Sequence, residues 1–334
     1  MTMKRTLGKS GIEVSAMGLG CWAIGGPWNF CGGPAGWGAV DDAESERAIR
    51  LAIDLGVTFF DTAANYGCGH SERVLGAAIR GKRDRVVIST KFGYAVDERA
   101  KEVTLYPPDE GDSDVAPRVR EDVERSLRRL GVDCIDVCLL HVGGLSTERA
   151  LAVRHELDGL VAAGKIRTYG WSTDRLDAVE AFSSSGNCAV VQQQFSVFDG
   201  NDDLLRYCER GNLASMNRGP LAMGLLTGKF SPDTSFSSDD FRQKVSWHPG
   251  YENGKPRKAW LDALASVREI LASDGRTLAQ GALAWLWARS PNAIPIPGFR
   301  NERQAEENAR AMEKGPLSKA QMDEIARLRA AASL

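Results

Sequence analysis

Residues Asp41–Asp61 read DDAESERAIRLAIDLGVTFFD, and two different periodicities lie side by side in this stretch. In Asp41–Leu55 the apolar residues recur at the three- and four-residue spacing of an amphipathic helix. The residues of this apolar stripe are Ala48, Ile49, Ala52, Ile53 and Leu55. Val57–Asp61 is instead a short apolar run rich in β-branched and aromatic residues, which is typical of a buried strand. The stretch therefore predicts a helix followed by a strand.

The same alternation recurs along the chain. The segments that read as buried strands are Met17–Cys21, Val57–Asp61, Val86–Thr90, Cys134–Leu140, Lys165–Gly170, Ala189–Gln192, Asn212–Met216 and Ala293–Pro297. Buried parallel strands that alternate with helices form either a doubly wound sheet or a closed barrel, because crossover helices must cover the strands. Eight such units favour the (β/α)8 or TIM barrel, and we expect residues 1–334 to form one barrel domain.

A hairpin is predicted before the first of these units. Arg5–Ser15 reads RTLGKSGIEVS and alternates around a Gly-Lys-Ser-Gly turn. We expect this hairpin to close the lower mouth of the barrel.

A dinucleotide-binding Rossmann domain is the main alternative fold. Gly18–Ala23 spells GxGxxA after a strand, and Asp41 and Asp42 follow about twenty residues later. That fingerprint requires a helix that begins at once and presents its free amides to a pyrophosphate. Here Gly25, Gly26 and Pro27 follow instead, so we reject this interpretation.

Composition points to small-molecule chemistry. The chain has 334 residues, of which 43% are hydrophobic and 26% charged, with a net charge of -2. Such a balance gives no overall attraction to nucleic acid or to an anionic membrane. The N-terminus lacks the apolar core of a signal peptide, and no run of about 18 apolar residues follows, so we expect a cytoplasmic protein. Composition leaves the oligomeric state open.

The cysteines and histidines do not suggest a metal site. The seven cysteines include no CxxC pair, and the four histidines form no HExxH motif. Cysteines within apolar runs behave as small core residues, and a zinc site needs a different spacing. We therefore expect no bound metal.

Three connections are too long for plain loops between a strand and a helix. They are Ile24–Val40, Phe92–Asp114 and Gly228–Lys258, and each follows a predicted strand. Barrel enzymes build their sites from such loops, although surface insertions tolerated by the fold remain an alternative. We assign the substrate pocket to the aromatic residues Trp22, Trp28, Trp37 and Tyr94. Apolar walls suit aryl aldehydes, ketones or the faces of sugars.

Four titratable residues lie at or just after three consecutive strand ends. Asp61 ends the second strand and Tyr66 follows it, Lys91 ends the third strand, and His141 ends the fourth. In a barrel these ends converge on one mouth. Each residue alone has an ordinary structural explanation, such as a helix cap, a solvated charge or packing. Together they indicate a catalytic site, because charged residues seldom end buried strands without partners.

This set of residues suits protonation of a carbonyl oxygen while a hydride reaches the carbon. A tyrosine has an ordinary pKa of about 10, and a nearby ammonium lowers it by about 1–3 units. Lys91 would supply that charge, Asp61 would hold the lysine, and His141 would bind the carbonyl. A Schiff-base lyase that uses Lys91 as its nucleophile is an alternative.

At these residues the chain resembles the aldo-keto reductase family along nearly its whole length. GVTFFDTAANYGCGHSERVLGAAI carries the family's Asp and Tyr, VVISTKFG its Lys, and DVCLLHVGG its His. The resemblance implies an NADP(H)-dependent oxidoreductase that reduces an aldehyde or ketone, with NAD(H) the less favoured cofactor. Tyr66 would be the general acid, supported by Lys91 and Asp61, and His141 would orient the substrate. Some barrels of this type are cofactor-sensing regulatory subunits with slow turnover, so that alternative stays open.

The resemblance also implies a set of cofactor-binding residues. Ser172, Thr173 and Gln192 would hold the nicotinamide carboxamide, and Phe195 would stack on its ring. The segment PLAMGLLTGKF would form a strap over the pyrophosphate, and IPGFRNERQAEEN would bind the adenosine end. The strap residues are Leu221, Gly224, Leu225 and Lys229, and the adenosine-end residues are Gly298, Phe299, Arg300, Gln304, Glu307 and Asn308.

One departure from the family pattern concerns Arg218. Many members have Tyr-Ser-Pro before the strap, whereas this chain has Arg218, Gly219 and Pro220. We assign Arg218 to the cofactor site as a candidate phosphate ligand.

Overall fold

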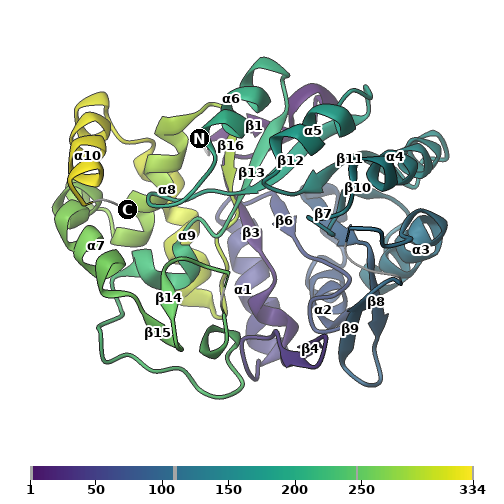
Figure 1. Cartoon of the computed structure of the whole chain (residues 1–334), viewed down its shortest axis with the longest axis horizontal. Helices are drawn as coiled ribbons and strands as arrows, with labels where there is room; N and C mark the ends of the chain where they lie inside the picture. Colours follow the sequence, from purple (N-terminus) through teal and green to yellow (C-terminus); the bar gives the residue numbers. More distant parts are fainter. Residues whose placement is uncertain (1–2, 108–110, 246, 333–334) are drawn as a thin grey trace.

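The computed structural model describes residues 3–107, 111–245 and 247–332; residues 108–110 and 246, in two of the long loops, lie outside the described part. The central sheet consists of β3 (Gly18–Gly20), β6 (Phe59–Asp61), β7 (Val87–Phe92), β10 (Ile135–Leu140), β11 (Ile166–Ser172), β12 (Cys188–Gln194), β13 (Ala214–Arg218) and β16 (Ala293–Pro295). All neighbours pair in parallel, in chain order. A parallel bridge between Gly20 and Gly298 joins the first strand to the end of the last. The predicted (β/α)8 barrel is confirmed (Figure 1).

All eight predicted strands overlap observed ones, but their ends differ by up to two residues. β7, β11 and β13 extend further toward their carboxyl ends than the apolar pattern predicted. Lys91, Ser172 and Arg218 lie in these extensions and are paired in the ladder. A run of apolar residues indicates which part of a strand is buried, whereas the hydrogen bonds to neighbouring strands define where the strand ends. The polar residues of the site are therefore held by the sheet itself.

The predicted hairpin is also confirmed. β1 (Lys4–Thr6) pairs antiparallel with β2 (Glu13–Ser15), at the opposite end of the barrel from the long loops (Figure 1). Leu7, Ile12 and Val14 pack against apolar side chains of the strands. Gly8 has φ +49°, and a Cβ there would lie 2.6 Å from the backbone oxygen of Ala189. Only glycine allows this close approach to the barrel floor.

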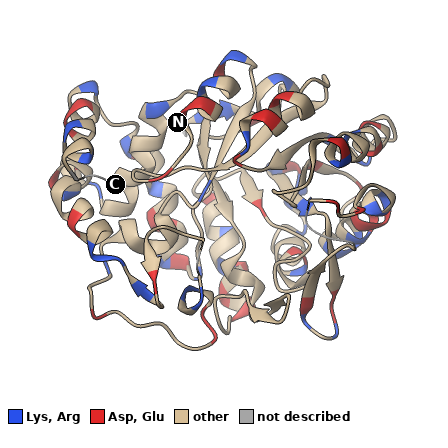
Figure 2. Cartoon of the chain, in the orientation of Figure 1, with Lys and Arg blue, Asp and Glu red and all other residues tan. Residues whose placement is uncertain are grey.

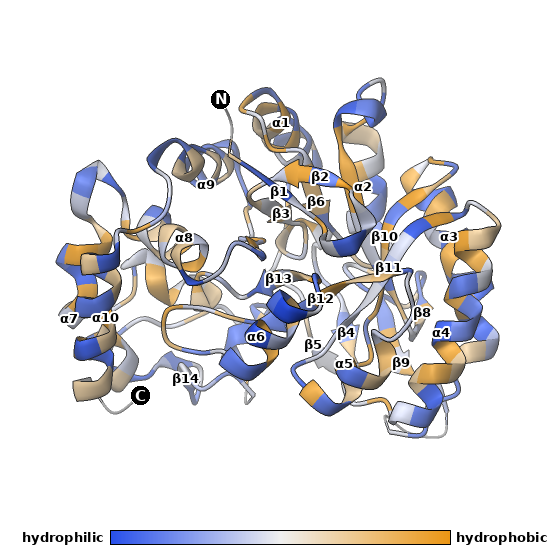
Figure 3. Cartoon of the chain, turned by 90° about the horizontal axis from the view of Figure 1, so that it is seen from above, coloured by the Kyte–Doolittle hydropathy of each residue, from blue (hydrophilic) through white to orange (hydrophobic). Residues whose placement is uncertain are grey.

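The helices form the outer layer. Those that follow the strands are α1 (Asp42–Asp54), α2 (His70–Ala78), α3 (Val119–Leu130), α4 (Thr147–Ala162), α5 (Leu176–Phe182), α6 (Asp202–Arg210), α8 (Leu278–Arg289) and α9 (Glu302–Lys314). Two further helices, α7 (Lys258–Leu271) and α10 (Lys319–Ala332), lie together at one side (Figure 1). Charged residues lie mainly on helices and loops, and the helices carry hydrophobic and hydrophilic residues in alternation (Figures 2 and 3). No helix in the described ranges is long and apolar enough to cross a membrane.

Helix α1 illustrates how the sequence determines the start of a helix and its buried face. The side chain of Asp41 caps its first turn by accepting a hydrogen bond from the backbone N–H of Glu44. Ala48, Ile49, Ala52 and Ile53 of the predicted stripe are buried, and Leu55 is partly buried. The helix predicted over Asp41–Leu55 is confirmed, with the two end residues as its caps.

The long loops pack against one another. β4 (Asn29–Phe30) of the first loop pairs with β9 (Glu102–Leu105) of the second, and β5 (Gly33–Pro34) and β8 (Tyr94–Asp97) complete this small sheet. The third loop forms its own hairpin of β14 (Tyr251–Glu252) and β15 (Lys255–Pro256). A bridge between Trp37 and Asp240 connects the first loop to the third. This mutual packing favours a common role at the barrel mouth over independent surface insertions.

The predicted absence of a Rossmann turn agrees with the local structure after β3. A short 3₁₀ turn at Ala23–Gly25 follows the strand, and the first α-helix begins only at Asp42. No helix therefore begins directly after Gly18–Gly20, where the dinucleotide fingerprint requires one.

Candidate active site

A cavity of about 1230 Å³ opens at the carboxyl ends of the barrel strands. Strand ends supply Asp61, His141, Ser172, Gln192 and Arg218 to its lining. The long loops supply most of its aromatic walls, which are Trp28, Trp37, Tyr94 and Trp247, and Trp22 and Tyr66 complete them. The four residues predicted for the substrate pocket all line this cavity.

Asp61, Lys91 and Tyr66 form one connected group. The Lys91 ammonium donates to Asp61 Oδ2 at 2.6 Å, to the backbone oxygen of Thr62 at 2.8 Å and to Tyr66 Oη at 3.2 Å. The side chains of Lys91 and Asp61 are 0% and 3% exposed. A buried ammonium with three oxygen acceptors is held in a fixed position, and its charge is directed at the phenol.

The charge state of this group follows from burial and pairing. Burial alone lowers the pKa of Lys91, but attraction to Asp61 and Tyr66 outweighs it, so its pKa is raised and it stays an ammonium. Burial also raises the pKa of Tyr66, and the Lys91 charge opposes only part of that effect. The expectation of a lowered tyrosine pKa is therefore wrong for this site, because desolvation of the phenolate outweighs the nearby charge. Tyr66 stays protonated at neutral pH, as a proton donor must.

His141 is held by Asn65, a residue that the sequence analysis did not single out. His141 Nδ1 lies 3.0 Å from Asn65 Oδ1, and the imidazole ring meets Tyr66 edge-on at 5.8 Å between centroids. Burial, and then the charges of Lys91 and Arg218, hold the pKa of His141 well below its ordinary value. The ring is therefore neutral at neutral pH. The only sequence signal for Asn65 was its position directly before Tyr66 in the quoted motif.

The three residues predicted to hold the nicotinamide carboxamide do not all face the cavity. Ser172 Oγ donates to Gln192 Oε1 at 2.9 Å, and Gln192 Nε2 donates to Asp61 Oδ1 at 3.2 Å. This chain of hydrogen bonds joins Ser172 and Gln192 to the Asp61–Lys91–Tyr66 group. Thr173 instead donates through Oγ1 to the backbone oxygen of Gly143 and is not part of the cavity lining. Thr173 supports the neighbouring loop.

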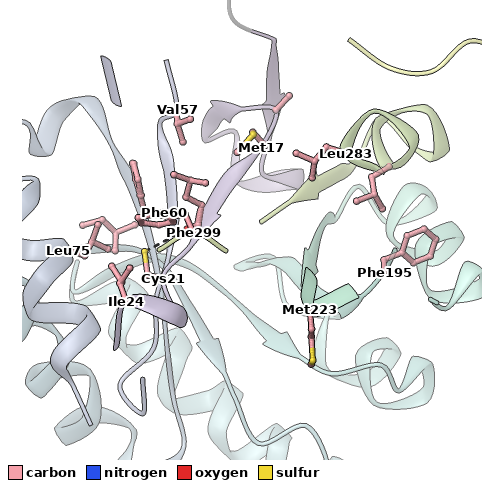
Figure 4. Packing of buried hydrophobic residues seen from close by; sticks show 14 of the residues in the cluster. Met17, Cys21, Ile24, Val57, Phe60, Leu75, Phe195, Met223, Leu283 and Phe299 are labelled. Atoms are coloured by element: carbon pink, nitrogen blue, oxygen red, sulfur yellow. Dashed lines mark hydrogen bonds between the residues drawn. The ribbon is translucent and has the colours of Figure 1, made fainter. Parts of the chain in front are cut away.

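The assignment of Phe195 to the nicotinamide ring is corrected. Phe195 is 2% exposed, stacks on Trp285 at 5.8 Å and is absent from the cavity lining. Figure 4 shows it among the buried hydrophobic side chains. Side chains alternate along a strand, so a residue three positions after the inward-facing Gln192 points outward. Arg218 is the side chain at the end of the next strand that does face the cavity, where it pairs with Asp174 and Gln194.

The strap segment lies along the cavity. Leu221, Gly224 and Lys229 line it, whereas Leu225 is buried in the core. Lys229 has no acidic partner within the described ranges. Its pKa is lowered by burial and by the nearby charges of Arg242 and Arg303. This concentration of positive charge favours an anion.

Arg242 fixes the third loop beside the strap. Its guanidinium binds both carboxylate oxygens of Asp240 and donates to the backbone oxygen of Met223. Met223 and Arg242 both line the cavity, and the sequence analysis named neither. Met223 lies inside the quoted strap segment, whereas no local pattern marks Arg242.

The residues predicted for the adenosine end are brought together around the start of α9. Asn301 caps this helix by accepting from the backbone N–H of Gln304. Gln304 Oε1 accepts from the backbone N–H of Arg300, and Asn308 Nδ2 donates to the Gly298 oxygen. All the residues assigned to this end line the cavity; they are Gly298, Phe299, Arg300, Gln304, Glu307 and Asn308. Free backbone amides at the start of a helix, with a basic side chain beside them, are suited to an anionic group.

Known proteins of one family resemble this chain along nearly its whole length. The model of the aldo/keto reductase family matches residues 16–330. The chain is 31% identical over 309 residues to the aldo-keto reductase YhdN of Bacillus subtilis, covering 90% of this chain and 86% of the relative. It is 30% identical to the NADH-specific methylglyoxal reductase of Escherichia coli over 316 residues, which is 92% of this chain and 93% of that protein.

A solved structure gives a similar result. The aldo-keto reductase from Klebsiella pneumoniae in complex with NADPH superposes with a TM-score of 0.69 at 28% identity. The alignment covers 98% of this chain and 96% of the other.

Proposed function

The chain belongs to the aldo/keto reductase family, and on this basis we propose that it is an NADP(H)-dependent oxidoreductase that reduces an aldehyde or ketone to an alcohol. The observation that carries the proposal is the Asp61–Lys91–Tyr66 group at the base of the cavity. A protonated phenol held beside a fixed ammonium is suited to give a proton to a carbonyl oxygen.

Each residue of the site has a separate task. Tyr66 donates the proton, Lys91 stabilises the phenolate that results, and Asp61 keeps Lys91 charged and in place. Ser172 and Gln192 are positioned to bind the carboxamide of a nicotinamide. NADPH, when bound there, would supply the hydride. The aromatic walls Trp22 and Trp37 meet edge-on at 5.3 Å and exclude water from one side of the reaction.

The side chains present fit a phosphorylated dinucleotide. Lys229 is partly buried and forms no ion pair within the described residues, and its pKa is lowered first by burial and then by the nearby charges of Arg242 and Arg303. A pyrophosphate would neutralise these positive charges. Arg300 lies at the capped N-terminus of α9 and would bind the 2′-phosphate, since its planar fork matches a phosphate.

We predict that Arg300→Ala weakens NADPH binding by about 1.5–3 kcal/mol, the typical value of a charge-assisted hydrogen bond. NADH binding should change little, because NADH lacks the 2′-phosphate. Arg300 is exposed and binds only the Ala39 oxygen through its side chain, so the substitution leaves the fold intact. Titrating both nucleotides by fluorescence quenching measures the difference.

Arg303→Ala is the matched control. Arg303 is on the same helix but pairs with Glu307 at 3.8 Å. We expect it to weaken NADPH less than Arg300→Ala does. Equal losses of NADPH and NADH affinity in Arg300→Ala would show that Arg300 does not recognise the 2′-phosphate.

We also predict the pH dependence of reduction. Only protonated Tyr66 can donate, and its pKa lies above the ordinary tyrosine value because of burial. The reduction rate should stay flat through neutral pH and fall only in strongly alkaline solution, when the coupled Tyr66–Lys91 pair loses a proton. His141 is already neutral, so it adds no ionisation near pH 6–7. Rate measurements under conditions where chemistry is slowest test this; a decline centred near neutrality would contradict it.

Two alternatives are less well supported. A Schiff-base lysine must be neutral and free, whereas Lys91 is charged and bonded to three oxygens. A regulatory subunit with slow turnover would have the same fold as an enzyme. Steady-state NADPH oxidation measured against a panel of aldehydes distinguishes the two. An enzyme should turn over its preferred class of aldehyde at about 1 s⁻¹ or more.

We infer that residues 1–334 form one barrel domain. We also infer that the protein binds small molecules rather than nucleic acid or a membrane, and that it is located in the cytoplasm. All seven cysteines are free, which fits a reducing compartment.

A further inference from the structure

A groove on the outer surface lies between α2 and α3, which pack side by side (Figure 1). The two helices approach closely at Gly76, where a Cβ would lie 2.4 Å from the backbone oxygen of Leu130. The groove has a volume of about 780 Å³, and the described residues that line it are all different from those that line the active-site cavity. Six arginines line this α2–α3 groove; they are Arg73, Arg80, Arg83, Arg125, Arg128 and Arg129.

The arginines of the α2–α3 groove outnumber their acidic partners. Arg80 and Arg128 are exposed, and neither forms an ion pair with any residue that the structure describes. The other four each have a different acidic partner; the pairs are Arg73 with Glu98, Arg83 with Asp136, Arg125 with Glu121 and Arg129 with Glu72. Two positive charges of the lining are therefore left without a counter-charge, a condition that favours an anion.

Stabilisation of helix ends explains only part of this set. Arg128 and Arg129 are in the last turn of α3, where the helix dipole favours cations. Arg73 is the fourth residue of α2, in the first turn, where the same dipole disfavours a cation. A negative group beside Arg73 offsets this cost, and in the structure that group is the carboxylate of Glu98.

Glu98 occupies the place of an anion between two guanidinium groups. It accepts hydrogen bonds from Arg73 and, at 3.1 Å, from Arg129 Nη1. The side chain of Arg129 is only 7% exposed and is fixed from below by the fully buried Glu72 at 2.6 Å. The side chain of Glu98, by contrast, is 42% exposed. A preformed arginine pair whose carboxylate is this exposed can exchange that carboxylate for a phosphate, which binds guanidinium groups in the same forked geometry.

We propose that the α2–α3 groove binds a linear polyphosphate anion, either inorganic or the triphosphate of a nucleotide. One end takes the place of the Glu98 carboxylate between Arg73 and Arg129. The other end is bound by Arg80 and Arg128, which supply the two charges without partners. Arg80 is seven residues beyond Arg73, roughly 10 Å along the axis of α2, so a chain of phosphates reaches both ends better than a single phosphate does.

Titration calorimetry with the full chain tests this. The protein is first saturated with NADP⁺, so that the basic groups of the active-site cavity, including Lys229 and Arg300, are occupied. Inorganic tripolyphosphate is then added in about 0.15 M salt, where weak surface attraction is screened. We expect one tripolyphosphate per chain, bound at least about tenfold more tightly than orthophosphate, because additional charge-assisted hydrogen bonds form. No binding to the saturated protein would overturn the proposal.

ATP in the same titration distinguishes the two sources of the ligand. Affinity equal to that of tripolyphosphate shows that the phosphates alone are bound, and higher affinity shows that the groove also holds the nucleoside.

A double variant localises the site. Arg80→Gln with Arg128→Gln should weaken tripolyphosphate by at least about tenfold, the loss expected for charge-assisted hydrogen bonds. Both side chains are exposed and have no ion pair in the described part of the chain, so the fold is retained. Arg210→Gln with Arg268→Gln is the matched control, since it removes the same charge from exposed positions on α6 and α7. Equal losses in the two double variants would show an effect of net charge alone and refute the site.

The exchange of Glu98 has its own test. Glu98→Gln frees Arg73 and Arg129, so we expect it to tighten tripolyphosphate by about two- to fivefold, the value of an exposed ion pair. Glu156→Gln removes the same charge from α4, where Glu156 pairs with Arg120, and should change the affinity much less. Unchanged or weaker binding by Glu98→Gln would contradict the exchange.

Discussion

Replacing Tyr66 with Phe is expected to lower the turnover number for carbonyl reduction by about 10²–10⁴-fold, the loss typical of a missing general acid. The phenol oxygen is the one polar group of this side chain, and Lys91 Nζ reaches it at 3.2 Å. Phenylalanine keeps the ring that stacks on Trp22 at 5.9 Å, so the wall of the cavity stays in place. NADPH affinity should be nearly unchanged. Single-turnover reduction rates and nucleotide titrations measure the two quantities separately.

Tyr94→Phe is the matched control for this experiment. Tyr94 lines the same cavity, and its hydroxyl contacts the His141 backbone oxygen at 3.3 Å. Its position away from Lys91 gives it no part in proton transfer, so we expect a loss far smaller than that of Tyr66→Phe. Reduction by Tyr66→Phe at a rate close to that of the native enzyme would remove Tyr66 from the role of general acid.

Replacing Lys91 with Met should damage both stability and turnover. It leaves the Asp61 carboxylate buried without its cation, and breaking a buried ion pair on one side costs about 3–5 kcal/mol. Ser89 and Gln192 still donate to Asp61 and offset part of that cost. Without the ammonium, burial raises the pKa of Tyr66 further, so proton donation becomes harder and turnover falls by orders of magnitude. Urea denaturation gives the change in the free energy of unfolding.

The double variant Asp61→Asn with Lys91→Met separates the two effects. It removes both buried charges, so we expect it to be more stable than Lys91→Met alone. Turnover should stay low, because the charge beside Tyr66 is still absent. A Lys91→Met protein as stable as the native one, or a double variant with native turnover, would contradict the assigned roles.

Much of the site was predictable because its signals are local. Asp61, Lys91 and His141 lie at or directly after strand ends that the apolar pattern marks, and in a parallel barrel those ends meet at one mouth. The quoted segment around Arg300 similarly suggested the adenosine end from a few adjacent residues, and in the structure Asn301 caps the helix that begins there. The assignment of Phe195 to the nicotinamide ring was wrong for a reason that is also local. Side chains alternate along β12, so Phe195 points outward.

Other features depended on residues far apart in the sequence. The partner of His141 is 76 positions away, and the small sheet joins two loops that no periodicity links. The direction of the Tyr66 pKa shift also required the structure, because it depends on how far burial of the phenolate exceeds the attraction of Lys91.

The sequence by itself determined the barrel and which residues make up the proposed catalytic group, because periodicity and strand-end residues are properties of short segments. The tertiary structure alone decided which side chains face the cavity, that Asn65 contacts His141, and that the three loops enclose one site. These properties arise from packing and desolvation between distant segments, and both depend on where the folded chain places atoms relative to water.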